Sequence, residues 1–276
     1  MQNELTQAVV IARRDGLRAC LSRGGRYLAE QLLPQVVREH RARGNVELPS
    51  DFNAYDHPPD PFATFDISPS VIKRGTGRPY PPYHGPQARL GLVRDGEWDR
   101  REPSVIESAY QPRYELYREG GERFEESVYY QSLKSRFEDE VRWQDTPWYR
   151  RSLEFIEQGR STSRGISSRA DLNSRCAAID GLYNRICREG YRSQRDLRNH
   201  PAAVHEVTVD IGRNGEFLFV NGRNRLTIAK LLGIETIPVG VYARHREWMD
   251  RREAIASGEP IPDAGIADDH PDLRDV

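Results

Sequence analysis

The sequence predicts an α/β protein of the α+β type, in which a small mixed sheet is flanked by helices. Three segments, 205–211, 217–220 and 237–242, have the alternating or continuous apolar residues that are typical of strands. Helical spacing of apolar residues extends over 122–190, and again over 4–43. We therefore expect a helical insertion between the parts of the chain that form the sheet, preceded by an N-terminal helical arm.

Composition limits the class of protein. The chain has 276 residues, of which 37% are hydrophobic and 30% are charged, and its formal net charge is −1. This balance gives no overall attraction to nucleic acid or to acidic membranes, so such binding would require a local patch. The sequence has no bilayer-length apolar run, no signal-peptide pattern and no CxxC pair among its three cysteines. We therefore expect a cytoplasmic protein.

Residues 1–46 are predicted to form a basic amphipathic helical arm. From Met1 to Gly44 the segment has eight arginines and four acids, and its apolar residues recur at helical spacing within 4–43. Such a helix packs on its own domain or lies on a membrane surface, and both interpretations stay open.

The main domain is predicted to occupy 47–249, with its helical insertion at about 122–198. A short strand at 63–67 opens the domain after a Pro- and Tyr-rich stretch, and 91–99 forms a turn. Pro147 suits the first turn of a helix. Trp143, Trp148 and Tyr149 could stack on a base, but aromatic residues on amphipathic helices are better explained by core packing.

The last part of the domain carries the strands of the sheet. Arg213-Asn214-Gly215 is a hairpin turn between the strands 205–211 and 217–220, and a short helix at 227–232 ends at Gly233. The strand 237–242 follows. Residues 250–276 hold eight acids and three arginines together with prolines and glycines, and are predicted to be a helix end that runs into an acidic, flexible, solvated tail.

The turn Asn221-Gly222-Arg223-Asn224-Arg225 carries the strongest functional signal. It joins an apolar strand to a helix, whose first N–H groups have no partner within the helix and lie at the positive end of its dipole. Gly222 permits close approach, and Arg223 and Arg225 add guanidinium forks. Together these groups suit phosphate binding. An ordinary strand-to-helix turn with surface arginines is the simpler interpretation.

The segment from this turn to Val241 resembles the ParB/sulfiredoxin-like superfamily. It has the turn, then Ala229-Lys-Leu-Leu-Gly233 and Ile237-Pro-Val239, in the family's order. The resemblance is close over His205–Trp248 and looser over Ala63–Asp99. Gly96-Glu-Trp-Asp99 and Trp143-Gln-Asp-Thr-Pro-Trp-Tyr149 are similar to segments of uncharacterised ParB-like-domain proteins of archaea and phages. The family includes CTP-hydrolysing partition clamps, ATP-using sulfiredoxins and ADP-dependent free-serine kinases.

The resemblance implies a nucleotide site in this turn, with ATP, ADP or CTP as the ligand. Gly222, Arg223 and Arg225 match the family's phosphate-binding turn. Asn221 stands where many members have an acid, and Asn224 stands where many have His or Arg. Asn cannot act as a general base, which puts family catalysis at position 221 in doubt. The turn lacks the sulfiredoxin cysteine, and no helix-turn-helix pattern follows, so neither a sulfiredoxin nor a partition role is expected.

Three residues outside the turn are further candidates. Glu97 and Asp99 flank Trp98 and could hold Mg²⁺ beside bound phosphates, or act catalytically, although acids in surface turns are commoner. His245, within Arg244-His-Arg246, could extend the anion site or simply leave the sheet. The seven histidines show no zinc-site spacing, so no zinc site is expected and the identity of any metal ligands stays open.

These observations favour a nucleotide-binding protein, with NTP hydrolysis or small-molecule phosphoryl transfer as candidate activities. The alternative is a non-catalytic DNA-binding or adaptor protein with the same fold. In that case arginines of 160–198 would contact DNA phosphates, and binding would depend steeply on salt. In a third hypothesis, the arm 4–43 docks on a membrane surface. The oligomeric state stays open.

Overall fold

The computed structural model describes residues 54–83, 90–118, 122–160, 162, 166–198, 205–259 and 269–276. All of these belong to one of the two units into which the chain divides. The predicted arm, 1–46, lies outside the described residues, so its membrane hypothesis stays a prediction. Across the described ranges, no helix has the length and apolar character needed to span a membrane.

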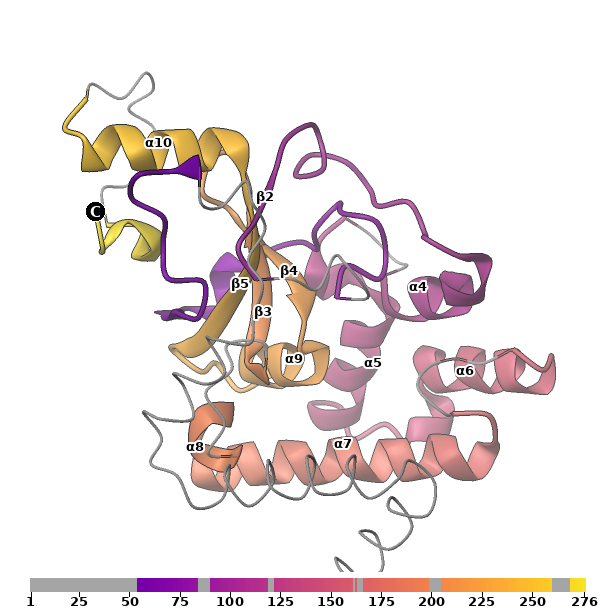
Figure 1. Cartoon of the computed structure of the whole chain (residues 1–276). Helices are drawn as coiled ribbons and strands as arrows, with labels where there is room; N and C mark the ends of the chain where they lie inside the picture. Colours follow the sequence, from indigo (N-terminus) through magenta and orange to yellow (C-terminus); the bar gives the residue numbers. More distant parts are fainter. Residues whose placement is uncertain are drawn as a thin grey trace, which may run out of the picture. The chain divides into compact units, whose positions relative to one another are not determined.

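A five-stranded mixed sheet lies at the centre of the fold (Figure 1), which confirms the predicted α+β class. The central order is β1-β5-β3-β4, and β2 also pairs with β5. β5 runs antiparallel to β1 and parallel to β2 and β3, whereas β3 and β4 form an antiparallel hairpin. The strands are β1 (Thr64–Ile67), β2 (Leu92–Arg94), β3 (Val207–Ile211), β4 (Phe217–Asn221) and β5 (Ile237–His245).

Seven α-helices surround this sheet within the described residues. Short 3-10 turns precede or connect several of them, at η2 (Pro69–Val71), η4 (Ser108–Tyr110), η5 (Phe124–Glu126), η6 (Trp143–Asp145) and η8 (Pro271–Leu273). The helices are α4 (Gln111–Arg118), α5 (Val128–Phe137), α6 (Pro147–Glu157), α7 (Arg169–Glu189), α8 (Gln194–Arg198), α9 (Arg223–Leu231) and α10 (Arg246–Ala256).

Local sequence explains most of the element boundaries. The side chains of Ser127, Thr146 and Ser168 accept hydrogen bonds from the first turns of α5, α6 and α7, because N-cap oxygens satisfy otherwise unpaired N–H groups. Pro147 begins α6, which confirms its predicted place in a first helical turn. The predicted hairpin turn is also confirmed, because Gly215 has a φ of 81° between β3 and β4.

Two buried clusters hold the helices and the sheet together. The first joins apolar residues of β1, β3, β4 and β5 to residues of α9 and α10, with Val207, Val209 and Ile211 of β3 fully buried. The second lies among α4, α5, α6 and α7. It contains Trp143, Trp148 and Tyr149, so their predicted core packing is confirmed. In Figure 1 the α4–α7 helices lie together to one side of the sheet.

The predicted acidic tail has more structure than its composition indicates. Helix α10 continues to Ala256, and η8 packs at the C-terminal end with Asp272 0% exposed. Asp272 accepts hydrogen bonds from Arg244 Nε at 2.9 Å and from Trp248 Nε1 at 2.8 Å, and lies 3.7 Å from Arg252 Nη1. Buried guanidinium groups require a carboxylate partner, and η8 supplies it. Residues 250–256 are the end of α10, in agreement with the predicted helix end, whereas Asp272 and Leu273 are buried where a solvated tail is predicted.

The stability contributed by Asp272 is expected to depend on pH. Burial alone would raise the pKa of this carboxyl, but Arg244 and Arg252 lower it below the ordinary value. A depressed folded-state pKa means that the contribution is complete above the unfolded value of about 3.9 and is lost as the pH falls through the folded value. Urea unfolding measured below about pH 5 should therefore be less steeply pH-dependent in Asp272→Asn than in the wild type. Parallel curves would contradict this assignment.

Candidate functional site

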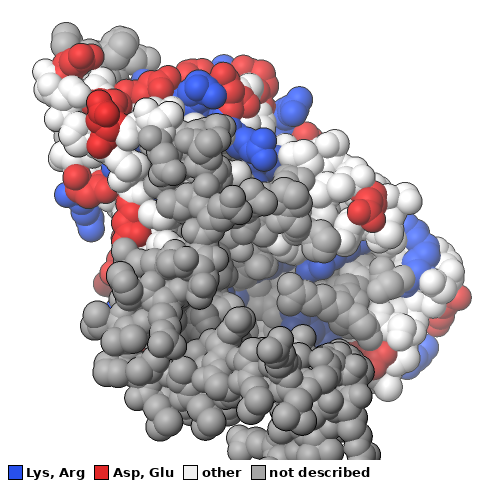
Figure 2. Space-filling model, viewed as in Figure 1, with Lys and Arg blue, Asp and Glu red and all other residues white. Residues whose placement is uncertain are grey.

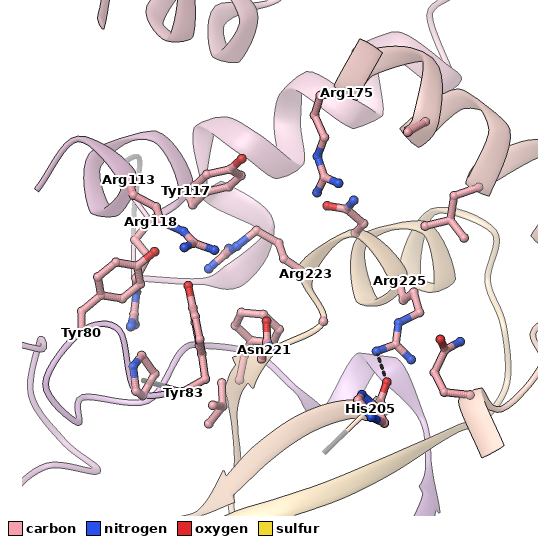
Figure 3. Close-up of a pocket in the computed structure, with 18 of the residues that line it drawn as sticks. Tyr80, Tyr83, Arg113, Tyr117, Arg118, Arg175, His205, Asn221, Arg223 and Arg225 are labelled. Carbon is pink, nitrogen blue, oxygen red and sulfur yellow. Dashed lines mark hydrogen bonds between the residues drawn. The ribbon is translucent and has the colours of Figure 1, made fainter. Parts of the chain in front are cut away.

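A pocket of about 650 Å³ opens beside the β4–α9 turn. Most of its walls come from four parts of the chain: the stretch around Tyr80–Tyr83, helix α4, helix α7, and the segment from Phe219 to Arg225. Gln194 and His205 complete the described lining. Figure 3 shows the side chains of these parts extending toward a common space. All five residues of the predicted phosphate-binding turn line this pocket, namely Asn221, Gly222, Arg223, Asn224 and Arg225.

The conformation of the turn depends on Gly222. This residue has a φ of 90° and is the N-cap of α9, and a Cβ added to it would lie 2.9 Å from the Cα of Val207. Only glycine tolerates both the left-handed backbone and this close approach. Gly222 has no side chain to cap α9, so the first N–H groups of that helix carry no side-chain cap. The helix therefore begins at the pocket with the donor groups that suit an anion.

Arg223 extends into the pocket over aromatic rings (Figure 3). Its guanidinium carbon lies 4.7 Å from the ring centre of Phe219 and 5.3 Å from that of Phe124. Burial and the nearby charge of Arg118 lower its pKa to about 10. Among the described residues no carboxylate lies within ion-pair distance of Arg223. Its hydrogen-bond donors therefore remain available to a ligand.

Arg225 and Asn224 have different roles, because both have protein partners. Arg225 Nη2 donates to the carbonyl oxygen of His205 at 2.6 Å, and its Nη1 lies 3.3 Å from Glu206. Asn224 Oδ1 accepts a hydrogen bond from Tyr129 at 2.6 Å. Glu206 is buried, which raises the pKa of its carboxyl even though Arg225 opposes the shift. These contacts fix the start of α9 against its neighbours, so Arg223 is the freer of the two turn arginines.

The pocket also contains arginines that the motif alone did not identify. Arg113 and Arg118 come from α4, and Arg175 and Arg185 come from α7. Arg175 and Arg185 belong to the arginines of 160–198 that would contact DNA phosphates in the alternative function. The helical spacing of these residues is the sequence signal that could have identified them. Positions 175, 178, 182 and 185 lie on one face of α7, and all four line the pocket. Tyr80, Tyr83 and Tyr117 also line the pocket.

The charge of the lining is one-sided. Six arginines line the pocket, and none of its described lining residues is Asp or Glu. Figure 2 shows Lys and Arg side chains within a hollow right of centre, whereas many Asp and Glu side chains lie along the upper edge of the same face. A concave surface with one sign of charge attracts ligands of the opposite sign.

The described lining of this pocket does not include Asp99, Glu97 or His245. Asp99 is 0% exposed and accepts hydrogen bonds from Arg213 Nε at 2.9 Å and Nη2 at 2.7 Å. His245 Nε2 lies 2.8 Å from the carbonyl oxygen of Gly96, and His245 Nδ1 caps α10. Glu97 lies 3.2 Å from Arg213. The geometry gives these three residues structural contacts around Arg213.

Metal-ligating side chains do not gather in the described part of the chain. Across the described ranges, no group of three or more His, Cys, Asp or Glu residues has the geometry of a metal site. Burial raises the pKa of the Cys176 thiol to about 12, which keeps this cysteine protonated and poorly nucleophilic. The chemistry that the site offers is therefore anion binding by arginines and helix N–H groups.

No family model matches the chain, and no curated protein or solved structure is significantly similar to it.

Proposed function

We propose that this chain is a nucleotide-binding protein that holds the phosphates of its ligand at the β4–α9 turn. One observation carries the proposal: a pocket of about 650 Å³ joins this turn to six arginines, with no carboxylate among its described lining residues. The volume is within the usual range for small-molecule sites, about 300–1,000 Å³. Arginine forks and helix N–H groups are the donors that phosphate oxygens prefer.

The β4–α9–β5 unit supports assignment to the ParB/sulfiredoxin-like class. An apolar strand, a glycine turn, a short helix ending near Gly233 and a strand beginning at Ile237 follow one another in the family's order. Tyr80 and Tyr117 are buried, whereas Tyr83 is half-buried in the lining and is the ring on which a nucleotide base can stack. ATP, ADP and CTP are accordingly the ligands to test first. Hydrolysis or phosphoryl transfer is the activity that the resemblance implies.

Replacement of Arg223 by glutamine is expected to weaken nucleotide binding about 10- to 100-fold, because a charge-assisted hydrogen bond contributes about 1.5–3 kcal/mol. Isothermal titration calorimetry with ATP, ADP and CTP in the presence of Mg²⁺ measures the affinity, and phosphate release measures turnover. Arg225→Ala is a poorer test, because it leaves Glu206 buried without its cationic partner.

Arg188→Gln is the matched control for Arg223→Gln. Arg188 is 74% exposed and is not among the lining residues of the pocket, so its loss removes the same charge without touching the site. Equal nucleotide affinity in Arg223→Gln and wild type, both folded by circular dichroism, would overturn the proposal. A loss of affinity in both variants would instead indicate a general charge effect.

A further inference from the structure

The arginines of the pocket surround one space from three helices. Arg113 and Arg118 lie on α4, Arg175 and Arg185 on α7, and Arg223 and Arg225 on α9. The electrostatic effects of three of these arginines agree with their placement around one pocket. The charge of Arg118 lowers the pKa of Arg223, and the charges of Arg175 and Arg223 both act on the hydroxyl of Tyr129. A ligand in the pocket therefore meets guanidinium groups from more than one side (Figure 3).

Most of this charge is not neutralised by the protein. Arg225 is paired with Glu206, and Arg118 donates one hydrogen bond to the carbonyl oxygen of Thr76. The other four pocket arginines are Arg113, Arg175, Arg185 and Arg223. In the described part of the chain, no carboxylate lies within ion-pair distance of any of them. Arg175 Nε is buried without a hydrogen-bond partner.

A second acid besides Glu206 acts on these arginines from outside the described pocket lining. Glu102 raises the pKa of Arg118 and, with Glu122, lines a separate small cavity that Arg118 and Arg223 also border. Its carboxylate accepts a hydrogen bond from Tyr114 at 3.1 Å. The positive charges of the pocket arginines repel one another in the absence of an anion. An anionic ligand should therefore stabilise the fold as it binds.

The same lining is unsuited to a divalent cation. Mg²⁺ is usually held by one or two protein carboxylates in addition to the oxygens of its ligand. The described lining provides amide and hydroxyl oxygens only, and Asn224 Oδ1 is already used by Tyr129. A cation bound to the phosphates would also face several guanidinium groups of its own sign. Arginine forks supply the countercharge directly and bind phosphate oxygens in a bidentate manner.

From these observations, and on the basis of the proposed function, we infer that the pocket binds a free polyphosphate anion, with arginines in place of a divalent cation. The ligand class is a molecule with two or more linked phosphate groups, because arginines from three helices line a pocket of about 650 Å³ and a longer anion can contact more of them than a single phosphate can. Nucleoside triphosphates and inorganic polyphosphates share this chemistry. The aromatic wall distinguishes them, since only the nucleotide has a base to stack.

The test compares affinities of the full chain by isothermal titration calorimetry. The probes are orthophosphate, pyrophosphate, tripolyphosphate and ATP, each with EDTA and with excess Mg²⁺. We expect the affinity to rise about tenfold or more from orthophosphate to tripolyphosphate, because each added phosphate gains charge-assisted hydrogen bonds. We also expect ATP to bind at least as tightly in EDTA as with Mg²⁺. ATP binding more tightly than tripolyphosphate would identify the nucleotide as the preferred source of the phosphates.

Each outcome has a distinct meaning. ATP binding that requires Mg²⁺, or orthophosphate that binds as tightly as tripolyphosphate, overturns the inference but leaves the proposed function in place. No binding of any probe under either condition overturns both. Arg175→Gln should weaken tripolyphosphate about tenfold and orthophosphate much less. Arg188→Gln, on the exposed side of the same helix, should leave both unchanged.

Discussion

Replacement of Asp272 by asparagine is expected to lower the free energy of unfolding by about 3–5 kcal/mol, the usual cost of breaking a buried ion pair. Asp272 is the carboxylate partner of Arg244 and Arg252, whose side chains are 2% and 1% exposed. Without its charge, two buried guanidinium groups would lose their main counterion. Both arginines already have buried nitrogen atoms without a hydrogen-bond partner. Urea unfolding followed by tryptophan fluorescence and circular dichroism measures the change.

Asp275 provides the matched control for this substitution. Its carboxylate is 52% exposed and lies 2.9 Å from Arg252 Nη2, so Asp275→Asn should cost less than about 1 kcal/mol. Equal effects of the two substitutions would contradict a specific role for Asp272. A double variant, Arg244→Met with Asp272→Leu, should recover part of the lost stability, because apolar side chains of similar volume often replace a buried ion pair without cost.

Asp99→Asn is expected to lower the free energy of unfolding by about 3 kcal/mol while leaving nucleotide affinity unchanged. Asp99 accepts three hydrogen bonds from Arg213, which is 7% exposed, and none of its contacts reaches the pocket. Burial would raise the pKa of this carboxyl, but Arg213 and His245 lower it overall. Asp99 is therefore charged and fully engaged near neutral pH. Chemical unfolding and nucleotide titration of the same preparation give the two values.

The opposite result would restore a catalytic role for Asp99. If Asp99→Asn abolished phosphate release without lowering stability, the residue would act in the chemistry of the site. Glu97→Gln is the control, because Glu97 is 61% exposed and contacts the same arginine. We expect Glu97→Gln to change stability by less than about 1 kcal/mol.

The sequence predicted the α+β class and most of the elements, because their signals are local. Alternation of apolar residues identified β3, and the Arg213-Asn-Gly215 turn identified the hairpin between β3 and β4. The predicted strand 237–242 is longer in the structure and extends to His245. Its extra residues pair with β2, and pairing between distant segments leaves no signal in a local window. The C-terminal contact of Asp272 was missed for the same reason.

The candidate site was predictable only in part. The turn 221–225 carries a recognisable pattern, and the structure places all five of its residues at one pocket. The arginines of α4 and α7 are far away in the sequence, and an exposed arginine on a helix is ordinarily solvated. Those side chains come to line one pocket only in the folded protein, where α7 packs against α9 and α4 packs against α5 and α6. Asp99, Glu97 and His245 show the converse, because their residue types suit a phosphate site but the structure places them around Arg213 and not in the pocket.

The position of β5 in the sheet has a consequence for the order in which the protein can be assembled on the ribosome. Among the described strands β5 comes last in the sequence, yet it pairs with β1, β2 and β3, so before its release the one pairing of these strands that can form is the β3–β4 hairpin. An isolated two-stranded hairpin is marginal in water. In the nascent chain, β1 and β2 therefore lack their sheet partner until Ile237–His245 emerges. Formation of the sheet is then expected to be slow, because its pairings join distant segments.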